Sequence, residues 1–190
     1  LEGKYICMRL PTGRDNILHR QLKYRLYAPS TAMDSILSRI LVNLCNTKPC
    51  EVYLDPFCGT GSLIVEAGYI GMRAIGSDIN PVAVRYAKML LSLHRINANL
   101  MIADARSLPL DDDSVDGIAT DPPYGISSKV FGGNLSNLYY SFLMEARRVL
   151  KRSRHLVICH TPRVPLIKMV DELGFEVCRT FSMRIHSGLT

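Results

Sequence analysis

A corner that offers only hydrogen-bond acceptors follows an apolar run in the middle of the chain. It reads Asp121-Pro122-Pro123-Tyr124, and Gly125 comes next. Two prolines end a strand or a helix and have no backbone N–H, so the acceptors that remain are the Asp121 carboxylate and nearby carbonyls. An aromatic ring stands beside them. Such a corner suits a planar group that donates two N–H bonds.

Acidic residues recur in this way, each at the end of an expected strand. The four acids are Asp55, Asp78, Asp104 and Asp121. In an open α/β sheet, ligands bind at the carboxyl ends of the strands, so we expect the four carboxylates to line one crevice. The alternative for any one of them is a helix N-cap.

The positioning elements follow from hydrophobic periodicity and from Gly and Pro stops. Strands are expected over 51–55, 73–78, 99–104, 114–121, 155–160 and 175–185. Helices are expected over 61–71, 81–96, 137–151 and 165–174. This alternation predicts an α/β protein with a Rossmann-like, doubly wound, mostly parallel sheet and helices on both faces.

The loop after Asp55 narrows the ligand class. Gly59 and Gly61 let the backbone approach a ligand at a helix N-terminus. Ile64 stands where a dinucleotide fingerprint needs a third glycine, and the lysine of a P-loop is absent, so a pyrophosphate is not expected. Asp78 is placed to accept from ribose hydroxyls, and Asp104 from an adenine amine. Carboxylates would also stabilise the positive charge of a sulfonium. A ligand with an adenine, a ribose and a sulfonium is S-adenosylmethionine.

Composition limits the class of protein, the kind of partner and the compartment that we expect. The 190 residues are 47% hydrophobic and 21% charged, as in ordinary globular proteins, and the net charge of +6 mildly favours a polyanionic partner. No apolar run approaches the roughly 20 residues of a membrane span. The six cysteines are scattered, so we expect free thiols, no metal site and a reducing, cytoplasmic compartment. Residues 1–30 are basic and irregular, and are expected to be a linker or an N-terminal extension to a domain over 31–190 of a longer protein.

Several motifs carry a resemblance. In chain order they are DPFCGTGSLIVEA, GSDINP, ADA and DPPYG. Together they resemble class I S-adenosylmethionine-dependent methyltransferases that act on amines. The segments RLYAPSTAMDSILSRILVNL, NLYYSFL and RIHSGLT extend the resemblance to the archaeal and eukaryotic tRNA guanosine-N2 methyltransferases. In that family an RNA-binding THUMP domain lies upstream, and this chain has no room for one.

The resemblance implies a role for individual residues. The cofactor loop would contain Asp55, Cys58, Gly59 and Gly61. The ribose would be held by Asp78 with Ile79 against adenine, and the adenine edge would meet Asp104 and Ala105. The methionine end would be flanked by Ser30 and Thr31, and Asp121 would border both the cofactor and the acceptor.

The acceptor corner then has a chemical interpretation. A nucleobase amine is a poor nucleophile because its lone pair is delocalised into the ring. If Asp121 and the Pro122 carbonyl accept its two hydrogens, electron density shifts to nitrogen, which can attack the sulfonium methyl. Asp121 can then take the surplus proton, and Tyr124 can stack on a base turned out of its helix. Pro123 completes the rigid corner.

Three functions remain open at this point. The preferred one is methyl transfer to the exocyclic N2 amine of a guanosine in tRNA. An adenine-N6 methyltransferase acting on DNA or RNA is the alternative, and a non-catalytic nucleic-acid-binding module is the third. Two basic clusters are either solvated faces or RNA contacts: the first contains Arg147, Arg148, Lys151, Arg152 and Arg154, and the second Arg14, His19, Arg20, Lys23 and Arg25.

Overall fold

The protein is built around one parallel sheet. The structure, a computed structural model, describes residues 33–125 and 134–182. Its five strands are β1 (Val52–Asp55), β2 (Arg73–Asp78), β3 (Asn99–Ile102), β4 (Val115–Thr120) and β5 (Leu150–Ile158). They lie in the order β3-β2-β1-β4-β5, and every neighbouring pair is parallel. This arrangement confirms the expected α/β, doubly wound architecture.

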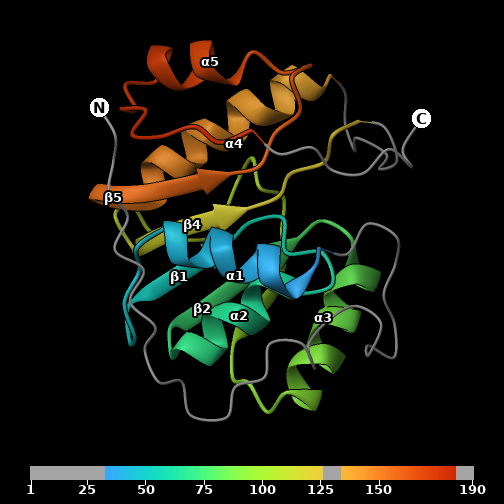
Figure 1. Ribbon diagram of the computed structural model, residues 1–190. Coiled ribbons are helices and arrows are strands. Elements are labelled where there is room, and N and C mark those ends of the chain that lie inside the picture. The colour runs from blue at the N-terminus through green and yellow to red at the C-terminus, as the bar shows by residue number, and fades with distance from the viewer. Residues whose placement is uncertain (1–32, 126–133, 183–190) are drawn as a thin grey trace.

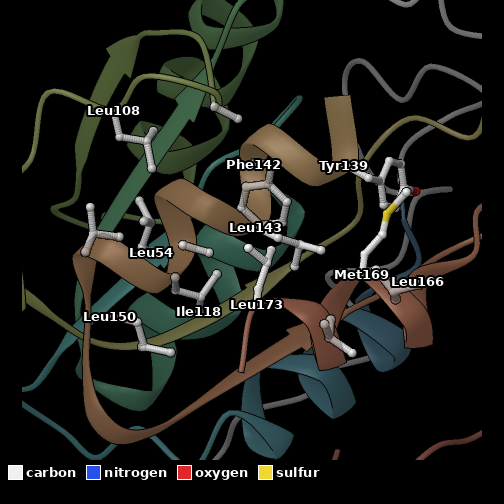
Figure 2. Close-up of a cluster of buried hydrophobic side chains, with 14 of the residues drawn as sticks. Leu54, Leu108, Ile118, Tyr139, Phe142, Leu143, Leu150, Leu166, Met169 and Leu173 are labelled. Carbon is white, nitrogen blue, oxygen red and sulfur yellow. The ribbon is translucent and has the colours of Figure 1, made fainter. Parts of the chain in front are cut away.

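Helices cover both faces of the sheet (Figure 1). The five helices are α1 (Ser35–Leu44), α2 (Ser62–Ile70), α3 (Pro81–Leu93), α4 (Leu135–Val149) and α5 (Leu166–Glu172). One core cluster joins α1, α2 and α3 to the sheet through residues such as Val42, Tyr53 and Ile64. The other joins α4 and α5 to the opposite face through residues such as Ile118, Phe142 and Met169 (Figure 2).

Local sequence explains where the helices begin. Asp34, Asn80 and Asn134 are the N-caps of α1, α3 and α4, and each side chain accepts a backbone N–H two residues on. Pro81 occupies the first turn of α3, where a missing N–H costs nothing. Gly71 ends α2 with φ +89°, a left-handed conformation that glycine adopts without a Cβ clash.

Three parts of the chain differ from the sequence-based expectation. No helix is expected from the sequence over residues 35–44, but the structure forms α1 there. The apolar face of α1 packs on α2. The strand β5 begins at Leu150 rather than 155, because Leu150 pairs with Val115 before an irregularity in the ladder. The expected sixth strand over 175–185 is wrong in its described part: no strand forms over 175–182, where the side chain of Phe181 is 71% exposed and the backbone finds no neighbouring strand.

Candidate active site

The four strand-end acids lie at one edge of the sheet. Asp55 and Asp78 are the last residues of β1 and β2, Asp121 directly follows β4, and Asp104 lies two residues after β3. The chain reverses its direction of strand addition between β1 and β4, and this switch point is where open α/β sheets bind ligands. All four acids line one continuous groove.

The helix-cap alternative is wrong for these acids. In the described part of the chain, the N-caps are Asp34, Gly61, Asn80, Asn134 and Pro165. The strand-end carboxylates therefore have other partners, which differ from one acid to the next.

Asp55 is a buried carboxyl at the centre of the edge. Its side chain is only 1% exposed, and its Oδ1 accepts the Thr120 hydroxyl at 2.6 Å and the Phe57 N–H at 3.2 Å. Burial raises the pKa of Asp55 to about 7, and the nearby Asp121 and Asp78 carboxylates add to the rise, whereas the two hydrogen bonds oppose it. Asp55 therefore titrates near neutral pH.

This raised pKa predicts a pH dependence of stability. The folded Asp55 binds a proton that the unfolded chain releases at its ordinary pKa of about 4, so the free energy of unfolding should fall as pH rises from about 4 to about 7. Asp55→Asn removes this titration while keeping the side-chain volume. We expect the melting temperature of the variant, relative to wild type, to be higher at pH 8 than at pH 5. A difference that is the same at both pH values would contradict the raised pKa.

The loop between β1 and α2 brings backbone to the groove. The Cys58 N–H donates to the Ser77 carbonyl at 2.8 Å, and the Cys58 side chain is buried. Gly59 has φ +51°, and a Cβ there would meet no atom within 4 Å, so open space lies beside it. A Cβ on Gly61 would lie 3.1 Å from the Ala87 Cβ. The second glycine thus permits close packing of α2 on α3, a role that differs from the expected ligand approach.

Asp78 anchors that loop and keeps acceptor capacity. Its Oδ2 accepts the Gly59 N–H at 2.9 Å, and its Oδ1 accepts the Asn80 N–H at 2.8 Å. Each carboxylate oxygen has a second lone pair, so both can accept a further hydroxyl. Burial raises the pKa of Asp78, while the two backbone bonds oppose the rise. The next side chain, Ile79, is 41% exposed along the same groove and offers an apolar surface.

Asp104 is largely engaged by Arg106. The Arg106 side chain contacts both carboxylate oxygens at 2.6–3.0 Å, and the Arg106 N–H adds a bond of 2.9 Å to Oδ1. A carboxylate offers about four acceptor sites, and because the single Nε–H is shared between the two oxygens, the hydrogens of Arg106 occupy most of them but not all. The Arg106 hydrogen bonds hold the pKa of Asp104 below its usual value. Asp104 and the buried Ala105 line the groove, but an adenine amine would have to displace part of this ion pair.

The acceptor corner is held from two directions. The Tyr124 hydroxyl donates to Asp121 Oδ1, and the Tyr139 hydroxyl of α4 donates to the Pro123 carbonyl at 3.4 Å. Pro122 is buried. Burial raises the pKa of Asp121, although the Tyr124 bond opposes the rise. Asp121 is thus a better proton acceptor than an exposed aspartate, and no hydrogen bond among the described residues reaches its Oδ2.

Sequence reasoning missed three of the residues that shape this edge: Thr120, Arg106 and Tyr139. Thr120 and Tyr139 act across 65 and 16 positions of sequence, and no local pattern reports such contacts. Arg106 lies two positions after Asp104, a spacing that could have suggested the ion pair. Two expected site residues, Ser30 and Thr31, lie outside the described residues.

The basic cluster at the end of α4 and the start of β5 lines the same groove as the four acids, but its ion pairs lie near the amino ends of the strands. Arg154 binds Glu51 at 2.8 Å and Asp116 at 3.1 Å, and Lys151 binds Asp116 at 2.9 Å. These partners precede β1 and begin β4, at the opposite edge of the sheet from Asp121. Arg148 is likewise paired, with Glu145 and Asp112. For these three cations, the structure favours a structural role over an RNA contact. The second cluster lies outside the described residues.

The buried acids fit a cationic ligand. The pKa of each of Asp55, Asp78 and Asp121 is raised, and no side-chain cation among the described residues opposes these shifts. A sulfonium beside such carboxylates would be stabilised by their charge. With the open space at Gly59 and the acceptors on Asp78, the residues present fit S-adenosylmethionine.

None of the described helices is long and apolar enough to cross a membrane.

Comparison with known proteins gives relatives for most of the chain. It is 38% identical over 160 residues to a tRNA (guanine(10)-N2)-dimethyltransferase of Methanothermobacter thermautotrophicus, covering 84% of this chain and 47% of that protein. It is 33% identical over 162 residues to a probable tRNA (guanine(10)-N2)-dimethyltransferase of Methanothermococcus thermolithotrophicus, covering 81% of this chain and 93% of that protein. The chain thus spans about half the length of the first relative.

Structural comparison supports the fold independently. The crystal structure of TrmN from Thermus thermophilus matches with a TM-score of 0.63 and 24% identity, over 72% of this chain and 41% of that chain. A family described as RMKL-like, methyltransferase domain matches residues 22–190. These matches confirm the class I methyltransferase resemblance, whose methyl donor is S-adenosylmethionine. The chain belongs to the RMKL-like methyltransferase domain family.

Proposed function

We propose that this protein transfers a methyl group from S-adenosylmethionine to the exocyclic N2 amine of a guanosine in tRNA. The observation that carries the proposal is the corner at the switch point, where Asp121 and two prolines present acceptors without donors. The names of relatives at 33–38% identity support tRNA as the acceptor and the guanine N2 amine as the target.

The cofactor would lie along the groove from Asp78 to Asp121. When bound, S-adenosylmethionine supplies an electrophilic methyl group on a sulfonium. Asp78 would accept from the ribose hydroxyls and Ile79 would cover one face of the adenine. The Gly59 loop and the buried Asp55 would border the methionine portion and its charge.

The acceptor corner would prepare the amine. Asp121 Oδ2 and the Pro122 carbonyl would accept its two hydrogens, which raises electron density on nitrogen, and Asp121 would receive the proton that the product loses. The Tyr124 ring would stack on the flipped base while its hydroxyl orients the Asp121 carboxylate. Holding the two substrates in contact supplies much of the rate.

The Arg106 ion pair leads to a prediction about cofactor affinity. Because Arg106 holds most of the acceptor sites of Asp104, it should compete with the adenine amine. A partly exposed ion pair of this kind contributes about 0.2–1 kcal/mol, so Arg106→Ala should tighten S-adenosylmethionine binding by up to about fivefold. Calorimetry of the variant and of Arg95→Ala, an exposed arginine after α3, gives the comparison. Weaker binding by Arg106→Ala alone would show that Arg106 supports the site.

Recognition of a whole tRNA extends beyond this groove. A pocket for one flipped base contacts little of the surrounding RNA, and choosing one guanosine needs shape and backbone contacts over a wider surface. We propose that an upstream RNA-binding domain supplies them in the full-length cytoplasmic protein. Tethering would then raise the effective concentration of RNA at the groove.

An acceptor panel tests the proposed function. The protein is incubated with radiolabelled cofactor and with tRNA or duplex DNA, and the labelled nucleosides are separated after digestion. We expect label in N2-methylated guanosine from tRNA. Label in N6-methyladenosine would favour the adenine alternative. Cofactor binding without transfer to any nucleic acid, at tRNA concentrations high enough to saturate this chain without an upstream domain, would refute the proposal.

A further inference from the structure

Tyr139 joins the hydrophobic core to the acceptor corner. The side chain lies on α4, is 0% exposed, and belongs to the cluster that also contains Leu166 and Met169 (Figure 2). Its hydroxyl reaches out of that cluster to the Pro123 carbonyl at 3.4 Å. One side chain therefore has its ring in the rigid interior and its polar end on the segment expected to bind the acceptor.

The corner itself has few means of holding its position. Pro122 and Pro123 have no backbone N–H, so they cannot donate to a neighbouring strand. The ladder with β5 ends beside it, where the Cys159 N–H donates to the Thr120 carbonyl at 3.1 Å. The Tyr124 hydroxyl binds Asp121, which lies within the same corner, so this bond shapes the corner without fixing it to the core. The bond from Tyr139 is a tie to a separate element.

A hydroxyl at this position is not needed for packing. Phe142 and Leu143 fill neighbouring parts of the same cluster with no polar atom, and both are fully buried. A buried hydroxyl loses its hydrogen bonds to water, and only a hydrogen bond within the protein offsets that loss. The pKa of Tyr139 is raised by burial and, next, by the Asp121 carboxylate, so the hydroxyl is also within electrostatic range of that acid. The hydroxyl of Tyr139 therefore contributes to the position of the acceptor corner and not to the packing of the core.

We propose that Tyr139 is a positioning residue for methyl transfer, which rests on the proposed function of the corner. By holding the Pro123 carbonyl, it fixes the direction in which the preceding Asp121 carboxylate and Pro122 carbonyl meet the amine. Displacement of a reacting group by about 1 Å can cost up to about 100-fold in rate, so even a modest loosening is measurable. Tyr139 touches neither the cofactor nor the amine in this assignment.

The test removes one oxygen atom from the protein. Tyr139→Phe keeps the ring volume, and cores usually tolerate volume-conserving changes, so the variant should fold. We expect kcat to fall about tenfold while the KM for tRNA and the cofactor dissociation constant stay within twofold. The matched control is Tyr140→Phe, the adjacent tyrosine on α4, whose side chain is 37% exposed and outside the cluster, and its kcat should be that of wild type.

A second readout does not depend on catalysis. Amide hydrogen exchange should become faster at Cys159, whose N–H donates to the Thr120 carbonyl beside the corner, in Tyr139→Phe, with exchange in α4 and in the rest of β4 and β5 unchanged. Wild-type kcat with unchanged exchange at this amide would overturn the proposal. Faster exchange throughout α4 and β4, with weaker cofactor binding, would also overturn it, because Tyr139 would then be a general core residue. If wild-type protein methylates no tRNA, the proposed function fails, and exchange alone decides whether Tyr139 ties the corner to the core.

Discussion

Asp121→Ala should fold, bind S-adenosylmethionine nearly as wild type does, and lose at least about 100-fold in methyl transfer. Asp121 meets the amine rather than the bulk of the cofactor, and general acid–base groups typically contribute about 10²–10⁴-fold. Single-turnover methylation at saturating cofactor and tRNA measures the chemical step. Calorimetry with S-adenosylmethionine measures binding in the same preparation.

The matched control for this change is Asp111→Ala. Asp111 is an exposed carboxylate that precedes β4, whereas Asp121 follows the same strand, so the control lies at the opposite edge of the sheet. Its transfer rate should equal that of wild type. If Asp121→Ala retains single-turnover methylation within about tenfold, equivalent to roughly 1.4 kcal/mol, Asp121 does not have the proposed role.

The second large effect is expected at Asp78. Asp78→Ala should weaken S-adenosylmethionine binding by about 1.5–3 kcal/mol, the usual scale for losing hydrogen bonds to a charged acceptor, or roughly 10- to 150-fold. The same carboxylate also anchors the Gly59 and Asn80 N–H groups, so the loop could loosen in the variant.

A cofactor analogue separates the two explanations. Wild-type protein should bind the 2′-deoxyribose analogue of S-adenosylmethionine more weakly than the natural cofactor, because one hydroxyl donor to Asp78 is lost. Asp78→Ala should discriminate much less between the two ligands. If the variant discriminates as strongly as wild type, the two losses are additive, and Asp78 acts through the loop rather than the ribose.

The sequence predicts the structure best where local interactions and hydrophobic periodicity determine it. The ends of β1 and β2 are Asp55 and Asp78, as expected, because each acid directly follows an apolar run that must be buried. The helices over 62–70 and 81–93 lie within the expected ranges, since Gly and Pro mark their ends. These local signals are sufficient to predict that the acids lie at one edge of the sheet.

Long-range contacts could not be predicted in the same way. Arg154 joins Glu51 across 103 positions of sequence, and such ion pairs, which involve Arg148, Lys151 and Arg154 of the basic cluster, could not be read from the sequence, where a solvated face and an RNA contact both stayed open. The segment 175–182 has strand-like residues, but a strand also needs a pairing partner, which sequence periodicity does not supply. The contacts of Thr120 with Asp55 and of Tyr139 with Pro123 likewise depend on which strands and helices become neighbours.

The bond formed by the transferred methyl group tests the central claim most directly. The protein is incubated with cofactor carrying a ¹³C-labelled methyl group and with tRNA whose guanosines alone are ¹⁵N-labelled, and the nucleosides are analysed by NMR. The account predicts a methyl carbon with a one-bond coupling to ¹⁵N at the guanine N2 position, lost in Asp121→Ala. A methylated nucleoside without that coupling, or with coupling only when adenosines carry the ¹⁵N label, would contradict it.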